Sequence, residues 1–266
     1  MMEFNKPVIG VAAAVVLIAA GTWYYLQSRH AATPPTAATV PPPAQPRESA
    51  EPAIQHPVPA GEGASKAPLP TLADSDPVIN EALGQLVGAA AMKDYWLPDG
   101  VVRRIVVTVD NLPRPKAAVQ KRPTGTVAGA IMVDGDELHA TLDPRNFVRY
   151  QPWVAVIDRL DMRQLAGAYL HFYPLLQQAY QDLGYPNGYF NDRLVQVIDH
   201  LLATPQPAQP IALVRPNVMY TYADPGLESR SAGQKLLIRM GPDNAAVIKA
   251  KLTELRAAVT TAPPKR

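Results

Sequence analysis

The sequence predicts a mainly α-helical domain with a small β element, an α+β fold, behind an N-terminal membrane helix and a linker rich in proline and alanine. Three observations support this prediction: an uncharged apolar run at residues 7–26, a concentration of proline at residues 33–70, and helical spacing of apolar residues over most of the remainder. The expected parts are a tail at 1–6, the membrane helix at 7–26, a disordered linker at 27–70, a single globular domain at 71–260 and a disordered tail at 261–266.

The apolar run at residues 7–26 contains 20 residues without a charged side chain. As a helix it would be roughly 30 Å long, which matches the hydrocarbon core of a bilayer. Trp23, Tyr24 and Tyr25 lie at its end, and aromatic rings favour the headgroup region. A cleaved signal peptide is the alternative, but its apolar region is usually only about 7–15 residues long. We therefore expect an uncleaved single-pass anchor with its short N-terminal tail inside and the domain outside the cytoplasm.

The stretch at residues 33–70 contains 11 of the 29 prolines and few large apolar side chains. Such a segment cannot bury enough surface to offset its chain entropy, so an extended linker is expected. The chain has 25 Lys and Arg against 23 Asp and Glu, a net charge of +2, which argues against broad nucleic-acid binding. The absence of cysteine excludes disulfides, thiolate metal sites and cysteine nucleophiles.

The first two helices of the domain are expected to begin at prolines. Asp76 resembles an N-cap, with Pro77 at the first helical position. Pro98 opens a second candidate helix that continues with apolar residues at helical spacing to Leu112. The β-branched residues of this second segment leave a strand open as the alternative.

Two segments have the character of β structure. Residues 128–142 predict a hairpin in which Asp134-Gly135 supplies the positive φ angles of a tight turn. Residues 211–223 follow a proline-rich break and predict one or two short strands.

The strongest helical pattern covers residues 161–183, where apolar residues follow steps of three and four without a miss. Asp161 with Gln164 resembles a capping box at its start. Pro174 lies inside the pattern, so we expect a kink near Leu170, whose carbonyl loses its hydrogen-bond donor.

Three further helices follow in the predicted domain. The first covers about residues 191–203. The second begins at a capping box of Ser231 and Gln234 and ends near Gly241, and the last covers about residues 242–258.

The loop GYPNGYFNDR, residues 184–193, joins two of these helices. It carries the candidate binding residues Tyr185, Asn187, Tyr189, Asn191, Asp192 and Arg193. In a structural interpretation, Gly184 ends one helix, residues 186–188 turn, Asn191 or a neighbour caps the next helix, and the aromatics pack as core. In a functional interpretation the tyrosines are exposed beside amide, carboxylate and guanidinium groups, a combination that suits sugars or peptide backbones.

Four long strings of the domain are distinctive: residues 109–114, 145–161, 172–205 and 213–244. Together they resemble the bacterial family catalogued as domain of unknown function 3014, and the likeness covers most of residues 71–259. The resemblance implies a bacterial envelope protein, so that the anchor would lie in the inner membrane and the domain in the periplasm. It implies no reaction and transfers no site residues.

No catalytic, cofactor-binding or metal-binding set is expected. The sequence contains no glycine-rich phosphate loop and no nucleophile elbow, and its histidines form no ligand pair at i and i+4. We therefore expect a single-pass membrane protein whose domain binds an envelope partner, either another protein or cell-wall polymer. The alternatives are an enzyme that acts on envelope polymer through Asp192, Asp199 or His200, and a purely structural scaffold.

Overall fold

The structure is a computed structural model that divides into two units, residues 1–50 and 51–266. It describes residues 53–58, 68–127, 129–136 and 138–260. The predicted membrane helix at 7–26 and most of the predicted linker lie outside these ranges. Across the ranges that are described, every helix is too short or too polar to cross a bilayer.

The described part of the chain is mainly helical, with two small antiparallel strand pairs, which confirms the predicted fold class. The helices are α2 (Asp76–Val87), α3 (Ala89–Tyr95), α4 (Val101–Asn111), η1 (Val119–Lys121, a 3₁₀ turn), α5 (Arg145–Val148), α6 (Gln151–Asp158), α7 (Met162–His171), α8 (Tyr173–Asp182), α9 (Phe190–Leu202), α10 (Pro225–Glu228), α11 (Ala232–Arg239) and α12 (Pro242–Thr260). The strands are β1 (Val133–Asp134), β2 (Thr141–Leu142), β3 (Leu213–Val214) and β4 (Thr221–Tyr222).

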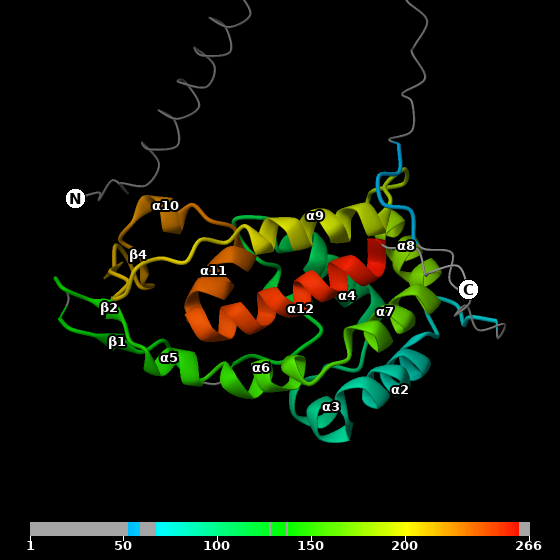
Figure 1. Cartoon of the computed structure of the whole chain (residues 1–266), viewed down its shortest axis with the longest axis horizontal. Helices are drawn as coiled ribbons and strands as arrows, with labels where there is room; N and C mark the ends of the chain where they lie inside the picture. Colours follow the sequence, from blue (N-terminus) through cyan, green and yellow to red (C-terminus); the bar gives the residue numbers. More distant parts are fainter. Residues whose placement is uncertain (1–52, 59–67, 128, 137, 261–266) are drawn as a thin grey trace, which may run out of the picture. The chain divides into compact units, whose positions relative to one another are not determined.

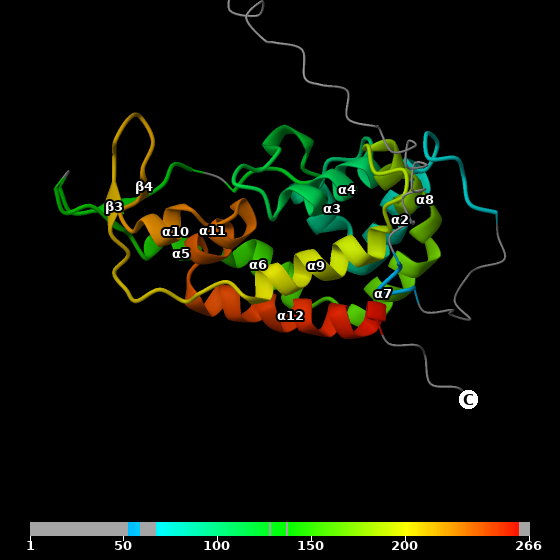
Figure 2. The same cartoon turned by 90° about the horizontal axis from the view of Figure 1, so that it is seen from above.

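Helix α12 packs against α6, α7 and α9, and α4 packs against α8 and α9. Figures 1 and 2 show α9 and α12 running along the unit, with the strand pairs at one end and α2, α7 and α8 at the other. The loop that leads into α9 therefore lies at the helical end, away from the strands.

The largest buried cluster joins α4 and α8 to the start of α9. Val101 and Val106 of α4 are fully buried, and Phe190 is 1% exposed. Burying such a side chain contributes about 1.5–3 kcal/mol, so this cluster is a principal source of stability at this end. The segment after Pro98 is therefore a helix rather than the alternative strand, because its valines share one buried helical face.

The predicted helix at 161–183 is two helices, α7 and α8, which meet at Phe172 (φ −90°, ψ 5°). Pro174 explains the interruption, because it has no N–H and its ring crowds the carbonyl of Leu170. The amides of Leu175 and Leu176 donate to the Phe172 carbonyl at 3.0 and 3.3 Å, so the hydrogen-bond ladder restarts there. The helix is disrupted within two residues of the predicted position at Leu170. The prediction of a kink was wrong, because the helix ends there and a new one begins.

The prediction that Asp76 caps the helix that begins beside it was wrong. Helix α2 includes Asp76, follows Ser75, and has no side-chain cap bond. The Asp76 carboxylate instead accepts from the amides of Gly100 at 2.7 Å and Val101 at 2.9 Å. It therefore caps α4, which is close to Asp76 in space although α3 separates the two helices in sequence.

The other two predicted N-caps are present as one-sided caps rather than reciprocal boxes. Asp161 accepts from the amides of Arg163 and Gln164, as an N-cap does. Ser231 accepts from the amide of Gln234, whose side chain donates to the carbonyl of His200 on α9. The second glutamine thus joins two helices instead of closing the box.

The first strand pair differs from the expected tight hairpin. Val133 pairs with Leu142 and Asp134 with Thr141, so residues 135–140 form a longer connection. Gly135 has φ 89°, and a side chain there would meet backbone atoms, so the glycine is required as expected even though the turn is wider. The pair β3–β4 confirms the predicted short strands near 211–223, and a bridge from Thr141 to Ala212 joins the two pairs.

Candidate functional site

The loop at 184–193 is held from α8, the helix before it. The Gln177 side chain donates to the carbonyl of Gly188 at 2.7 Å and accepts from the amide of Phe190 at 2.8 Å. The Tyr173 hydroxyl accepts from the amide of Asn191 at 3.3 Å. These bonds cap the first turn of α9, so the expectation that Asn191 or a neighbour does so is wrong. The Asn191 and Asp192 side chains are thereby left for other contacts.

Tyr185 and Arg193 belong to a group that we call the Asp110 cluster, formed by Asp110, Arg114, Tyr185 and Arg193. Asp110, on α4, is 1% exposed. Arg193 donates to its Oδ1 at 3.0 Å and to its main-chain carbonyl at 2.8 Å. Arg114 donates to Oδ2 at 2.5 Å and to the Tyr185 hydroxyl at 2.9 Å, and that hydroxyl donates to Oδ2 at 3.3 Å. Both carboxylate oxygens are satisfied within the domain, so this cluster stabilises the fold.

The other half of the loop contacts Ala53–Val58, a segment from the stretch expected to be linker. The Asp192 carboxylate accepts from the amide of Gln55 at 3.0 Å and from that of His56 at 2.6 Å. Asn191 Nδ2 donates to the His56 carbonyl at 2.8 Å, and the Tyr189 hydroxyl accepts from the amide of Val58 at 2.9 Å. Figure 1 shows this segment in blue beside α8 and the start of α9. We call Tyr189, Asn191 and Asp192 the main-chain site.

The main-chain site satisfies each N–H group from residue 55 to residue 58. Gln55, His56 and Val58 donate to it, and Pro57 has no N–H group. The bound segment bends at Gln55 and His56, which brings two successive amides onto one carboxylate. All four hydrogen bonds go to backbone atoms of the segment, so its side chains take no part in these contacts.

Asn191 is fully buried and is positioned by two neighbouring helices. Its side-chain oxygen accepts from the Tyr169 hydroxyl of α7 at 2.8 Å, and its amide also donates to the Val259 carbonyl of α12 at 3.1 Å. Burial raises the pKa of the phenols of Tyr169 and Tyr173, so both stay neutral at physiological pH. The Asn191 side chain is therefore held by contacts within the domain as well as by the segment.

The side chains of the segment make two further contacts. Val58 packs against the apolar cluster of α4 and α8, and His56 is half-buried near Asp199. The pKa of Asp199 is lowered mainly by its hydrogen bonds with Arg256, at 2.6 and 3.0 Å, and to a smaller extent by the charge of His56. A basic residue and an aliphatic residue thus flank Pro57 in the bound segment.

The structure divides the six candidate residues between two places. Tyr189, Asn191 and Asp192 form the main-chain site, whereas Tyr185 and Arg193 belong to the Asp110 cluster. Asn187 is exposed in the turn before α9.

Sequence reasoning missed the supporting residues Tyr169, Tyr173 and Gln177, because they lie on the two preceding helices. It also missed the bound segment. The available signal was Ile54 and Val58, two aliphatic residues in a stretch with few large apolar side chains.

The three groups considered for acid–base catalysis have separate partners. Asp192 accepts from the bound segment, Asp199 pairs with Arg256, and His200 shares a hydrogen bond of 2.8 Å with Ser231. Burial, aided by two nearby arginines, lowers the pKa of His200. The contacts thus direct these side chains to different places. Within the ranges that the structure covers, no group of three acidic or histidine side chains could hold a metal ion.

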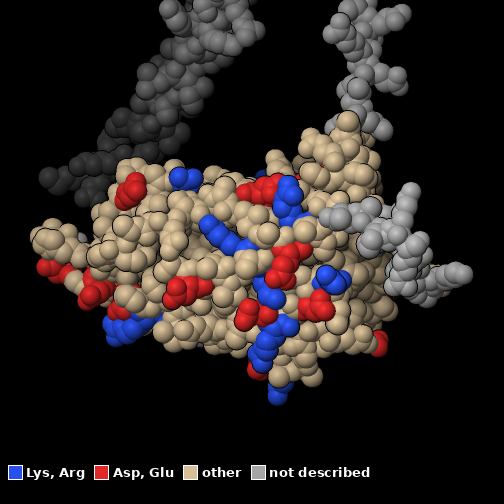
Figure 3. Space-filling view, viewed as in Figure 1, with Lys and Arg blue, Asp and Glu red and all other residues tan. Residues whose placement is uncertain are grey.

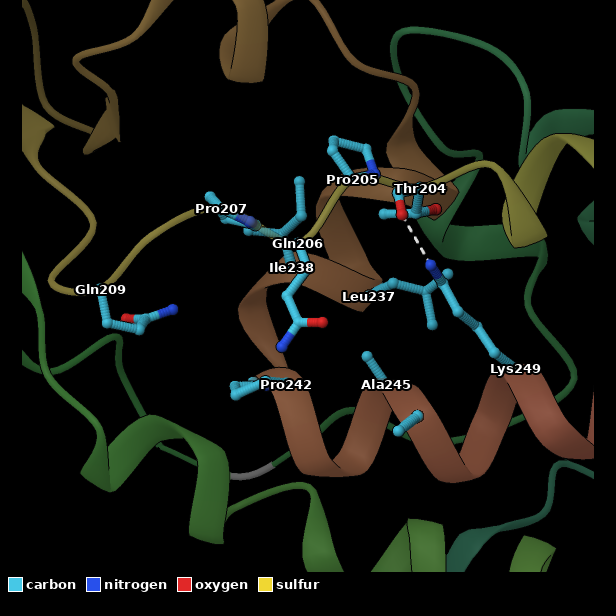
Figure 4. Close-up of a pocket in the computed structure, with 12 residues that line it drawn as sticks. Thr204, Pro205, Gln206, Pro207, Gln209, Leu237, Ile238, Pro242, Ala245 and Lys249 are labelled. Carbon is cyan, nitrogen blue, oxygen red and sulfur yellow. Dashed lines mark hydrogen bonds between the residues drawn. The ribbon is translucent and has the colours of Figure 1, made fainter.

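A separate hollow lies between α11, α12 and the proline-rich segment after α9 (Figure 4). Its volume is about 110 Å³, and its walls include Pro205, Pro207, Leu237 and Ala245. The Lys249 ammonium donates to the Thr204 carbonyl at 2.6 Å, drawn as a dashed line in Figure 4. The hollow is small and mainly apolar, and the Lys249 ammonium links α12 to the segment after α9.

Charged side chains are interspersed on the face shown in Figure 3, where acidic and basic groups alternate over α9 and α12. Arg256 with Asp199 is one of the ion pairs in this region. The mixed pattern gives this face no extended field of one sign, so any partner here must be recognised through individual contacts.

Residues 101–256 match the family described as a protein of unknown function (DUF3014). No curated protein and no solved structure matches the chain. The main-chain site and the Asp110 cluster both lie inside the matched residues, whereas the bound segment Ala53–Val58 precedes them.

Proposed function

The chain belongs to the DUF3014 family, and we propose that its domain is a polypeptide-binding module held at the bacterial inner membrane. The observation that carries this proposal is the main-chain site, which binds three N–H groups and one carbonyl of Gln55–Val58. Two successive peptide N–H groups on one carboxylate are a feature of polypeptide recognition, which favours an envelope protein over cell-wall polymer as the partner.

The proposed membrane attachment rests on the sequence. The apolar run at residues 7–26 is long enough to span a bilayer and ends in three aromatic residues. With its short tail inside, the run would place the domain in the periplasm, where it would meet envelope proteins.

The proposed role is binding without a chemical step. The side chains that would serve an envelope hydrolase, Asp192, Asp199 and His200, contact three different partners. Asp192 in particular accepts an amide hydrogen on each of its two carboxylate oxygens.

The location is tested by fusing alkaline phosphatase to the C-terminus of the full chain and fractionating the cells. The proposal expects phosphatase activity, which requires the periplasm, and recovery of the protein in the membrane fraction without cleavage after residue 26. An inactive fusion, or a soluble protein trimmed after the apolar run, would contradict the proposed attachment.

The binding role is tested by in-cell photocrosslinking from Gln196, an exposed residue one turn beyond Asp192 on α9. We expect adducts with defined envelope polypeptides, and Asp192→Ala should reduce them. Asp243→Ala is the matched control, because Asp243 is also an acidic residue in the first turn of a helix, α12. Adducts that contain no protein, or that respond equally to the two substitutions, would contradict the role.

A further inference from the structure

We propose that Ala53–Val58 is a displaceable self-ligand of the main-chain site, and that the site's partner presents a similar segment, in which a proline is followed by an aliphatic residue. This inference rests on the proposed function and names the ligand class and the regulation of the same site. The self-ligand occupies the atoms that a partner would use, so the domain controls access to its own binding site.

The contacts of the segment are those of a ligand rather than of a core strand. Its four hydrogen bonds to the site involve backbone atoms of the segment. The side chain of Val58 packs against the apolar cluster of α4 and α8. Ile54 is 54% exposed, and Gln55 and Pro57 are also exposed. A segment with so little buried apolar surface gains little beyond its hydrogen bonds, so it can leave without unfolding the domain.

The domain retains its own supports when the segment leaves. Asn191 still accepts from Tyr169 and donates to the Val259 carbonyl, and the first turn of α9 is still capped by Gln177 and Tyr173. The site therefore keeps its geometry for another polypeptide, as a pre-organised binding site does.

The ligand class follows from three positions of the bound segment. At His56 the amide donates to Asp192 and the carbonyl accepts from Asn191. At Pro57 the site offers no acceptor and the residue has no N–H, so proline fits without loss of a hydrogen bond. At Val58 an aliphatic side chain reaches the apolar cluster. Gln55 contributes its amide alone, so its side chain is free to vary.

Covalent connection gives the self-ligand an advantage over free peptides. A short linker produces an effective concentration on the order of millimolar, so a free peptide with the same contacts competes poorly. A partner gains access when it binds more tightly or when the self-ligand is weakened. This competition is the regulatory step.

The test uses the full chain and a fluorescein-labelled peptide of sequence AIQHPV, with binding followed by fluorescence anisotropy. Gln55→Pro with His56→Pro removes both N–H donors to Asp192 and leaves the domain residues unchanged. Ala53→Pro with Ile54→Pro is the matched control, because it places two prolines in the same segment outside the residues that bond to the site. Each variant is first shown by circular dichroism to keep the helical content of the unsubstituted chain and a cooperative unfolding transition.

The released variant should bind the peptide roughly tenfold or more tightly than the unsubstituted chain and the control do, because the competing self-ligand is lost. Adding Asp192→Ala to the released variant should remove that gain. A peptide with alanine in place of the valine should bind more weakly, because it loses the contact with the apolar cluster.

The outcomes separate the two proposals. Equal peptide binding by the unsubstituted and released chains would overturn the self-ligand and leave polypeptide binding intact. No binding by a folded released variant would overturn the polypeptide-binding function and this inference with it. Binding that is indifferent to the proline and the valine of the peptide would overturn the proposed ligand class.

Discussion

The Asp110 cluster and the main-chain site lie at the same loop and use the same chemistry, yet they do different things. In each, both oxygens of a carboxylate accept hydrogen bonds. Asp110 receives them from Arg193, Arg114 and Tyr185, which are side chains of the domain. Asp192 receives them from main-chain amides of a segment that the family match does not include.

On the proposed function, the partner rather than the residue type separates a stabilising group from a binding group. The side chains around Asp110 are ordered when the domain folds, so their cluster is part of the fold. The partners of Asp192 belong to a separate stretch of chain, and under the proposed self-ligand their ordering is an additional event. The predictions below test this distinction from the largest expected change in stability to the smallest.

The largest effect is expected for Asp110→Ala. This change leaves the Arg193 guanidinium, whose side chain is 19% exposed, without its buried carboxylate. Breaking such a pair should lower the free energy of unfolding by about 3 kcal/mol, measured by urea denaturation. Arg114→Ala is the control, because that side chain is 49% exposed and its loss should cost less than about 1 kcal/mol. A smaller effect of Asp110→Ala than of the control would break the distinction.

A smaller but clear loss is expected for Asn191→Ala, since Asn191 belongs to both the fold and the site. The change removes the partners of Tyr169 and of the Val259 carbonyl, and should lower the free energy of unfolding by about 2 kcal/mol. It should also release the segment, which is seen as faster hydrogen exchange at Val58 and its neighbours. Asn187→Ala, at an exposed position, should change neither measurement.

For Asp192→Ala we expect a loss of under about 1 kcal/mol, because the carboxylate bonds the segment rather than the domain core. The amides of Gln55 and His56 should nevertheless exchange much faster by NMR, because their acceptor is gone. Asp243→Ala should leave that exchange unchanged. Unaltered protection at Gln55 and His56 in Asp192→Ala would show that the segment is held by other means.

The smallest effect concerns pH. Burial and two arginines lower the pKa of His200 below its ordinary value of 6.5, so below that pH the unfolded chain binds a proton more readily than the folded chain. Stability should therefore fall as the pH drops from 6.5 toward the lowered folded value, and His200→Gln should flatten this part of the profile. Thermal unfolding across pH 5 to 7.5 measures it. A profile that is unchanged by His200→Gln would assign the slope to other groups.

The sequence by itself determined the features that depend on neighbours along the chain. Apolar spacing identified the helices now seen as α4, α9 and α12, because periodicity reflects which face each helix buries. Pro174 marked the break between α7 and α8, because its missing N–H acts on the residue four positions earlier.

Only the tertiary structure decided which partner each polar group receives. Asp76 caps α4 instead of α2, and Asp192 binds amides more than a hundred residues away in sequence. The sequence spacing of such groups carries no record of these pairings, because they arise when packed helices bring distant segments together. The composition of residues 184–193 could therefore suggest peptide-binding chemistry, but the fold alone assigned Tyr185 and Arg193 to stability and Asp192 to the bound segment.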